Sequence, residues 1–133
     1  MKLVVHVDGG ARGNPGPAAA GAVLSTPDGE VVDEASELLG IVSNNVAEYR
    51  ALLLGVRRAK ELGATEVEVV NDSELIAKQI NGQYKVKHPD MKPLYAEAIA
   101  ALGELDAWAV RTVRREQNTH ADALVNAALD AAR

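Results

Sequence analysis

The chain has 133 residues, long enough to bury roughly two-thirds of its unfolded surface without disulfides, so we expect one domain over residues 1–133. It has no cysteine, which excludes thiol nucleophiles and thiolate metal sites. The net charge of −5 argues against a protein that coats nucleic acid by bulk electrostatics. The sequence shows no signal peptide or membrane-spanning stretch, so we expect a cytoplasmic monomer without membrane contact.

Apolar runs bounded by turn residues predict strands, and apolar spacing of three and four residues predicts helices. Strands are expected over residues 2–8, 20–24, 30–39, 66–70 and 107–113, and helices over residues 46–62, 72–80, 94–105 and 119–132. Residues 9–17 are expected to form a constrained loop and residues 81–93 a polar segment. With no Phe, one Trp and three Tyr, the core should be aliphatic.

The resulting order is βββαβααβα, in which short connections join the first three strands into an antiparallel meander. The fourth strand follows a helix and is therefore expected to run parallel to the first. These patterns predict an α/β fold with a mixed five-stranded sheet, three antiparallel strands plus two parallel ones, flanked by helices on both faces. No repeat or linker marks a second domain.

Two acids of the first half are candidates for a functional site. Asp8 ends the first predicted strand, where α/β folds collect reactive groups, although an Asp at this position can also cap a turn. Glu48 lies on the apolar face of the predicted helix, which points it toward the sheet. The alternative for Glu48 is a capping box with Asn45 as the N-cap.

Two acids of the second half complete the candidate set. Asp72 follows the fourth strand as Asp8 follows the first, but it could also be a plain N-cap. Asp122 shares a helical stripe with Val125 and Leu129, and an acid on an apolar stripe needs a partner. Asn118 is the better N-cap for that helix, which leaves Asp122 free.

The four acids together suggest a metal site. If the first and fourth strands are parallel neighbours, Asp8 and Asp72 lie about 5 Å apart and raise each other's pKa unless a cation neutralises them. Carboxylate ligands without cysteine suit Mg²⁺ or Mn²⁺. Two such ions, about 3.5 to 4 Å apart, would support phosphodiester cleavage.

Four stretches of the chain, in order, resemble the type 1 ribonuclease H family, and most closely its compact prokaryotic branch. They are DGGARGNPGP at residues 8–17, SNNVAEYRAL at residues 43–52, NDS at residues 71–73 and NTHAD at residues 118–122. The similarity covers essentially the whole chain. The resemblance implies the ribonuclease H fold and metal-dependent endonucleolytic cleavage of the RNA strand of an RNA–DNA hybrid, with 5′-phosphate and 3′-hydroxyl ends.

The resemblance also implies roles for individual residues. It makes Asp8, Glu48, Asp72 and Asp122 the catalytic acids that bind Mg²⁺ or Mn²⁺, with two ions in the site. The residues expected to bind the substrate are Gly9, Gly10, Asn14, Ser43, Asn44, Asn45, Asn71, Ser73, Tyr84, Lys85, Lys87 and Asn118. Amide side chains suit this role because the wide minor groove of an A-form-like duplex displays 2′-hydroxyls.

The chain departs from the family pattern before its last acid. Between Val113 and Asp122 it has no room for the mobile loop on which many members carry a His. Arg115, seven residues before Asp122, looks like a substitute that could bind a phosphate or the departing oxygen but could not act as a general base. His120 is expected to face solvent.

Tyr84, Lys85 and Lys87 belong to the densest run of positive charge in this acidic protein. The run could be a solvated loop, or a groove for the DNA strand in which the tyrosine stacks on a sugar or base. It is shorter than the basic protrusion of longer family members, so weaker and salt-sensitive binding is expected.

Three other functions compete with hybrid cleavage. The domain could bind hybrids without cutting them, although a pure binder would not need four acids. It could be a broader nuclease that also cuts double-stranded RNA. It could also be an interaction domain that uses its Ala-rich last helix, which would predict no metal dependence.

Overall fold

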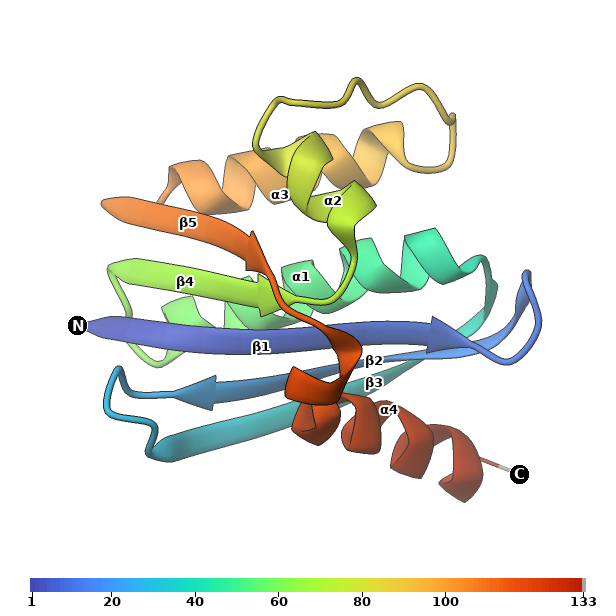
Figure 1. Ribbon diagram of the computed structural model, residues 1–133, viewed down its shortest axis with the longest axis horizontal. Coiled ribbons are helices and arrows are strands. Elements are labelled where there is room, and N and C mark those ends of the chain that lie inside the picture. The colour runs from blue at the N-terminus through green and yellow to red at the C-terminus, as the bar shows by residue number, and fades with distance from the viewer. Residues whose placement is uncertain (133) are drawn as a thin grey trace.

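The computed structural model describes residues 1–132. They form a five-stranded sheet with helices packed against it (Figure 1). The strands are β1 (Lys2–Ala11), β2 (Gly16–Ser25), β3 (Val31–Val42), β4 (Glu66–Asn71) and β5 (Ala107–Thr112). Their order across the sheet is β3-β2-β1-β4-β5. β2 pairs antiparallel with β1 and β3, and β4 runs parallel to β1 and β5. The predicted mixed sheet is confirmed, including the parallel pairing of the first and fourth strands.

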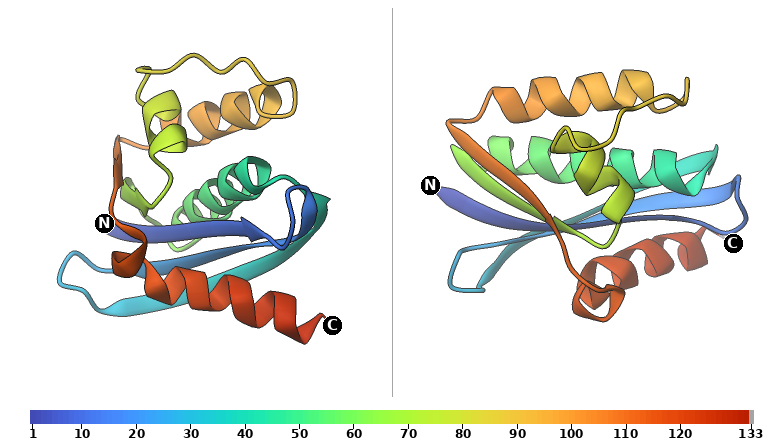
Figure 2. Two further views of the ribbon diagram at one scale, coloured as in Figure 1. Left: turned by 45° about the vertical axis from the view of Figure 1, so that its right-hand side comes forward. Right: turned by 45° about the horizontal axis from the view of Figure 1, so that its top comes forward.

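Helices cover both faces of this sheet. On one side lie α1 (Asn44–Glu61), α2 (Glu74–Ile80) and α3 (Lys92–Gly103). On the other side lies α4 (Thr119–Ala131), which follows the short 3₁₀ helix η1 (Arg115–Gln117). Figure 2 shows α1 between the sheet and α3, with α4 alone on the opposite face. Apart from η1, the element order is the predicted one.

The main core lies between α1 and the sheet and is aliphatic, as the composition predicts. Leu3, Val5 and Val7 are alternate residues of β1, and each is at most 2% exposed. Gly55 lets α1 approach these side chains closely, because a Cβ at that position would lie 2.6 Å from Cγ1 of Val5. The strand that carries Asp8 is therefore fixed by packing against the helix that carries Glu48.

The first two strands are longer than the sequence predicts. Gly9 and Gly10 remain paired with β2, opposite Ala20 and Ala19, so the loop spans residues 12–15 and not residues 9–17. A glycine loses entropy in a strand but keeps both backbone hydrogen-bonding groups. Asp8 consequently lies within β1, two residues beyond the last pairing of β1 with β4 at His6. The expectation that Asp8 ends the strand was wrong.

Helix bounds also differ from the predicted ones by up to two residues. α1 begins at Asn44, α2 at Glu74 and α3 at Lys92. Pro93 was predicted to belong to the polar segment, but it lies in the first turn of α3, where its missing N–H breaks no intrahelical bond. Within residues 1–132, no helix is long and apolar enough to cross a membrane.

Candidate active site

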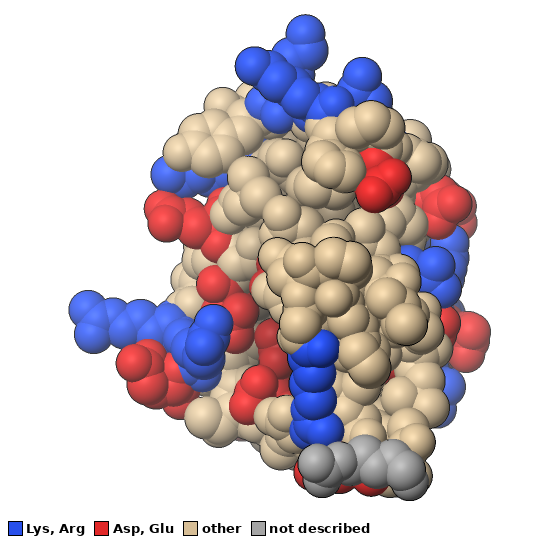
Figure 3. Space-filling model, turned by 90° about the vertical axis from the view of Figure 1, so that its right-hand side faces the viewer, with Lys and Arg blue, Asp and Glu red and all other residues tan. Residues whose placement is uncertain are grey.

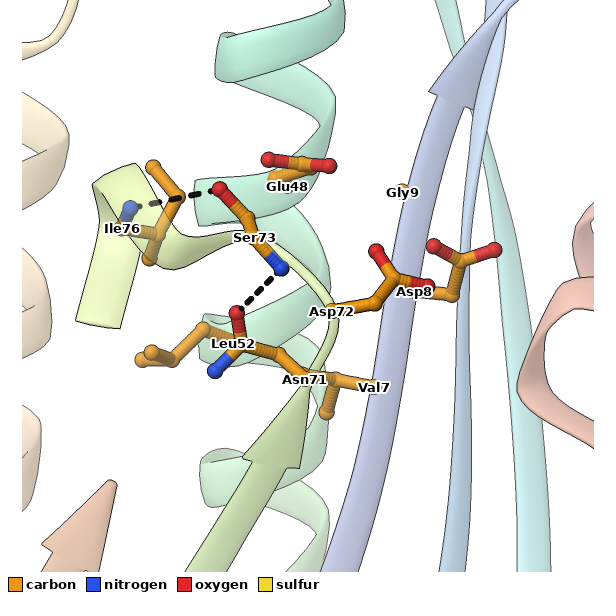
Figure 4. A pocket seen from close by; sticks show the side chains of 9 residues that line it. All are labelled: Val7, Asp8, Gly9, Glu48, Leu52, Asn71, Asp72, Ser73 and Ile76. Atoms are coloured by element: carbon orange, nitrogen blue, oxygen red, sulfur yellow. Dashed lines mark hydrogen bonds between the residues drawn. The ribbon is translucent and has the colours of Figure 1, made fainter. Parts of the chain in front are cut away.

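Asp8 and Asp72 come together because β1 runs on past the end of β4. The two strands pair in parallel as far as His6 and Val70, and Asp72 follows directly after β4. Figure 4 shows the carboxylates of Asp8 and Asp72 turned toward each other. The parallel register therefore places two acids from distant parts of the chain side by side, where β4 ends next to β1 in the middle of the sheet.

The turn around Asp72 is held by its two neighbours. Oδ1 of Asn71 accepts a hydrogen bond from the backbone N of Ser73 at 2.8 Å, and Nδ2 of Asn71 donates to the carbonyl of Arg111 at 3.1 Å. Ser73 is the N-cap of α2, since its Oγ accepts from the backbone N of Ile76 at 3.2 Å. Asp72 is therefore not the N-cap, and its carboxylate is free to face the other acids.

Glu48 reaches the site from the second turn of α1. The N-cap of this helix is Ser43, whose Oγ accepts from the backbone N of Val46 at 3.2 Å. The alternative in which Asn45 caps the helix and Glu48 completes a capping box was wrong, because the helix begins earlier. Glu48 instead points at the pocket between β1, around Asp8, and the end of β4 (Figure 4).

Three carboxylates share this half-buried position. Ligand atoms of Asp8, Glu48 and Asp72 all lie within 4.8 Å of one another. Burial raises the pKa of Asp8 to about 8, with further contributions from Asp72, Asp122 and Glu48. Burial likewise raises the pKa of Glu48 to about 7, although Ser73 and Arg115 counteract part of this effect. Such an arrangement stores mutual repulsion that a divalent cation would relieve.

Asp122 approaches the same site from α4, outside the cluster of three. It contributes to the raised pKa of Asp8 through a side-chain hydrogen bond and through its charge. Val125 and Leu129 follow it on the helix and are buried with Ala19 in a small apolar cluster against β2. This packing fixes the helix face that presents Asp122 to Asp8.

Asn118 occupies the N-cap position of α4 but does not cap it with its side chain. Its side chain is buried, and Nδ2 donates to the carbonyl of Val7 at 2.8 Å and to Oδ2 of Asp72 at 3.5 Å. The prediction that Asn118 is the N-cap is confirmed for its position, but its side chain turns inward to bond β1 and Asp72 and makes no capping bond. Asn118 as a whole is 1% exposed, and its predicted contact with the substrate stays a prediction.

Sequence reasoning missed Asn126, one helical turn beyond Asp122. Its Nδ2 donates to both the carbonyl oxygen and Oδ2 of Asp122, at 3.2 Å each. The spacing of four residues along a helix, which makes such contacts possible, was the available signal.

Arg115 and His120 occupy different positions relative to the acids. Arg115 is exposed in η1 and lies near enough to Glu48 to lower the pKa of that carboxyl group. His120 turns toward β3, where its Nε2 lies 2.7 Å from Oε2 of Glu34. The structure thus places the guanidinium of Arg115 beside the cluster of acids, whereas His120 contacts Glu34 on β3.

The loop after β1 is clamped to the start of α1 by two asparagines. The backbone N of Ala11 donates to Oδ1 of Asn44, and the backbone N of Asn44 donates to Oδ1 of Asn14, both at 3.1 Å. Asn45 lies next to Asn44 in the first turn of α1. Both clamping bonds use the side-chain oxygens, so the Nδ2 donors remain available.

Of the two glycines after Asp8, packing requires only Gly9. A Cβ on Gly9 would lie 2.1 Å from the carbonyl oxygen of Ala47 in α1, whereas a Cβ on Gly10 would meet Cγ1 of Val125 at 3.5 Å. Gly9 therefore allows β1 and the start of α1 to touch, which brings Asp8 close to Glu48.

Tyr84, Lys85 and Lys87 are exposed in the segment between α2 and α3. Nζ of Lys78 lies 5.0 Å from the ring centroid of Tyr84 and 3.4 Å from its hydroxyl oxygen, which ties this segment to α2. On the face shown in Figure 3, Lys and Arg side chains (blue) gather at the upper edge and acids (red) lie near the middle. Other blue side chains lie to the left of the centre and just below it, beside the red ones, so positive charge is not confined to the upper edge of this face.

Comparison with known proteins identifies the family of proteins to which this mixed sheet and its cluster of acids belong. Residues 6–128 match the family described as "Reverse transcriptase-like". The chain is 48% identical over 133 residues to the "Bifunctional protein Rv2228c" of Mycobacterium tuberculosis. The alignment covers 99% of this chain and 36% of that protein. The chain thus spans about a third of the length of this curated relative.

Two further relatives narrow the class. "Ribonuclease HI" of Halobacterium salinarum is 41% identical to this chain, and the alignment covers 97% of this chain and 65% of that protein. The crystal structure of RNase H1 from the same archaeon superposes on this chain with a TM-score of 0.96 over 98% of both chains. LC11-RNase H1, solved in complex with an RNA/DNA hybrid, is 41% identical with a TM-score of 0.94 over 98% of each chain. The chain belongs to the type 1 ribonuclease H family.

Proposed function

We propose that this chain is a metal-dependent endonuclease that hydrolyses the RNA strand of RNA–DNA hybrids. The observation that carries the proposal is the cluster of Asp8, Glu48 and Asp72, whose ligand atoms lie within 4.8 Å of one another. Membership of the ribonuclease H family and the hybrid bound in the LC11-RNase H1 structure support the choice of substrate. The reaction leaves a 5′-phosphate and a 3′-hydroxyl.

The donor set fits Mg²⁺ or Mn²⁺, which prefer oxygen ligands. Asp8, Glu48 and Asp72 would hold the ions, with Asp122 at the side of Asp8. The pKa values of Asp8 and Glu48 are raised first by burial and then by the neighbouring acids, and a bound cation would stabilise the ionised carboxylates against both effects. Two bound ions would activate a water molecule and stabilise the leaving oxygen of a phosphodiester.

The asparagine clamp supplies donors for the minor groove of the hybrid. Because Oδ1 of Asn14 and Oδ1 of Asn44 accept backbone hydrogen bonds, the amides are fixed with Nδ2 directed away from those bonds. An Nδ2 donor can bond the oxygen of a 2′-hydroxyl, which only the RNA strand carries. Asn45 is expected to act with them. The remaining polar residues expected to bind the substrate form hydrogen bonds with backbone groups in the structure, and they are proposed to bind the substrate as well: Ser43, Asn71, Ser73 and Asn118.

Arg115 is assigned to the reacting phosphate. Arg115 is exposed beside Glu48. A guanidinium can donate two parallel hydrogen bonds to the oxygens of one phosphate. It keeps its proton at neutral pH and therefore serves as a charge and hydrogen-bond donor, not as a general base.

The segment with Tyr84, Lys85 and Lys87 is assigned to the DNA strand. These side chains are exposed, and the contact of Lys78 with the Tyr84 ring orients that ring. Contacts to a nucleic-acid backbone release counterions, so binding at this segment depends on salt. We propose that the protein acts as a cytoplasmic monomer on this substrate.

The test is cleavage of a labelled RNA–DNA hybrid with Mg²⁺, with Mn²⁺ and with a chelator, for the wild type and the Asp72→Asn variant. Double-stranded and single-stranded RNA serve as parallel substrates. The proposal predicts metal-dependent cutting of the hybrid that is lost in the variant. Binding of the hybrid without cutting under either metal would favour a non-catalytic binding module, and equal cutting of double-stranded RNA would favour a broader nuclease.

A further inference from the structure

Asp122 differs from the other acids in how its carboxylate is held. Glu48 accepts a hydrogen bond from Ser73, and Asp72 accepts one from buried Asn118. Asp122 lies on α4, outside the cluster of three, and its side chain is bonded by Asn126 on the exposed side of the helix. Packing of α4 places Asp122 beside Asp8, and Asn126 adds a hydrogen bond to its carboxylate.

Asn126 makes two bonds with its single amide nitrogen. A bond from an asparagine side chain to the carbonyl four residues earlier is a common local feature of helices. Here the same Nδ2 atom also lies 3.2 Å from Oδ2 of Asp122, equal to its distance from the Asp122 carbonyl oxygen. The second bond restricts the rotation of the Asp122 carboxylate, which the first bond alone would not do.

Arg12 fixes which way the Asn126 amide faces. Its Nη2 lies 3.5 Å from Oδ1 of Asn126 and forms an ion pair with Oδ1 of Asp130 at 2.7 Å. A guanidinium can only donate, so it selects the oxygen side of the amide and leaves Nδ2 toward Asp122. Asp122, Asn126 and Asp130 are spaced four residues apart, so they share one face of α4.

We propose that Asn126 is a positioning residue that holds the Asp122 carboxylate toward the metal site, and that Arg12 orients Asn126 for this task. The inference rests on the proposed function, because it assigns Asp122 to that site. Arg12 belongs to the same loop as Asn14, so the loop that would contact the substrate also supports the fourth acid.

A positioning role and a merely structural role predict effects of different size. An exposed hydrogen-bonded pair four residues apart on a helix adds little to stability. A partner that orients a metal ligand typically changes metal affinity by about 10 to 100-fold when it is removed. Removal of the Asn126 amide should therefore change metal binding far more than it changes folding.

The experiment is calorimetric titration of the whole chain with Mn²⁺, without nucleic acid, alongside thermal unfolding without metal. Asn126→Ala is measured in the wild type and in an Asp122→Asn background, which forms a double-mutant cycle. Asn126→Gln retains an amide that can reach a carboxylate four residues away and serves as the rescue variant. Arg12→Ala tests the orienting contact.

We expect Asn126→Ala to weaken Mn²⁺ binding by about tenfold in the wild type and by less than about twofold when Asp122 is already Asn. Asn126→Gln should recover most of the affinity, and Arg12→Ala should lose part of it. Equal losses in both backgrounds, or unchanged Mn²⁺ binding by a folded Asn126→Ala protein, would overturn the proposal. A cycle that couples the two residues in a protein that does not cut hybrids would refute the proposed function alone.

Discussion

The carboxylates of Asp8 and Asp72 face each other because β1 continues to Ala11, beyond its last pairing with β4 at His6. Neither acid has a basic side chain bonded to it among residues 1–132. The two carboxylates are thus held together at the middle of the sheet, where ionisation of both is unfavourable.

The metal-free protein should lose stability as the pH rises. Asp8 has a pKa of about 8 and Glu48 of about 7 in the folded state, while both are ordinary carboxyl groups when unfolded. Between about pH 4 and pH 8 the folded state therefore binds more protons than the unfolded state, so stability falls across that window. Thermal unfolding in chelator should show a falling midpoint for the wild type and a flatter one for Asp8→Asn.

The same experiment has a control with metal. Mg²⁺ should raise the unfolding midpoint of the wild type at pH 8 more than at pH 5, because protons compete with the cation for the carboxylates. Identical pH profiles for the wild type and Asp8→Asn would show that the cluster does not carry this repulsion.

Substitution of the two glycines after Asp8 should have unequal effects. Gly9→Ala places a Cβ 2.1 Å from the backbone oxygen of Ala47, so it should destabilise the fold by about 1 to 3 kcal/mol or more and separate Asp8 from Glu48. Gly10→Ala meets Cγ1 of Val125 at an ordinary 3.5 Å and is the matched control. Unfolding curves and hybrid cleavage should both rank Gly9→Ala well below Gly10→Ala; similar behaviour of the two would contradict the close approach.

Asn14→Asp separates the clamp from substrate recognition. The carboxylate can still accept from the backbone N of Asn44, so the unfolding midpoint should change little. It no longer offers an Nδ2 donor and adds negative charge, so KM for the hybrid should rise by about tenfold or more, which corresponds to about 1.4 kcal/mol. Asn14→Ala, which loses both functions, should impair stability as well. An unchanged KM for Asn14→Asp would remove Asn14 from the proposed contacts.

Replacement of Lys85 and Lys87 by Ala should weaken hybrid binding and reduce its salt dependence. Each lost phosphate contact lowers the slope of log K against log salt by about 0.7 to 0.9. Lys2→Ala, at the start of β1, removes one positive charge and is the control for Lys85→Ala and Lys87→Ala measured singly. The measurement is hybrid affinity over a series of salt concentrations. A double variant that kept the wild-type slope would contradict the proposal that this segment binds the DNA strand.

The sequence predicted the layout of the fold because its signals were local and consistent. Short Val-rich stretches marked the central strands, and the helix between the third and fourth strands indicated a parallel crossover. The convergence of Asp8, Glu48 and Asp72 followed from that topology. Their role in binding metal stays a prediction.

The errors arose where tertiary contacts overrode local preference. Gly9 and Gly10 were interpreted as loop residues, yet β2 offers backbone partners that keep them in the strand. Asn118 was interpreted as a cap, yet the carbonyl of Val7, distant in the sequence, binds its amide. The contact of Arg12 with Asn126 joins the first and last tenths of the chain, so no local pattern could indicate it.

The most direct test of the account is to map the cut strand and its ends in a hybrid labelled separately on RNA and DNA, with the wild type and Asp8→Asn in Mg²⁺. The account predicts internal cuts in the RNA strand only, with 5′-phosphate and 3′-hydroxyl ends, and no cuts by Asp8→Asn. Cleavage of the DNA strand, or undiminished cleavage by folded Asp8→Asn, would contradict it.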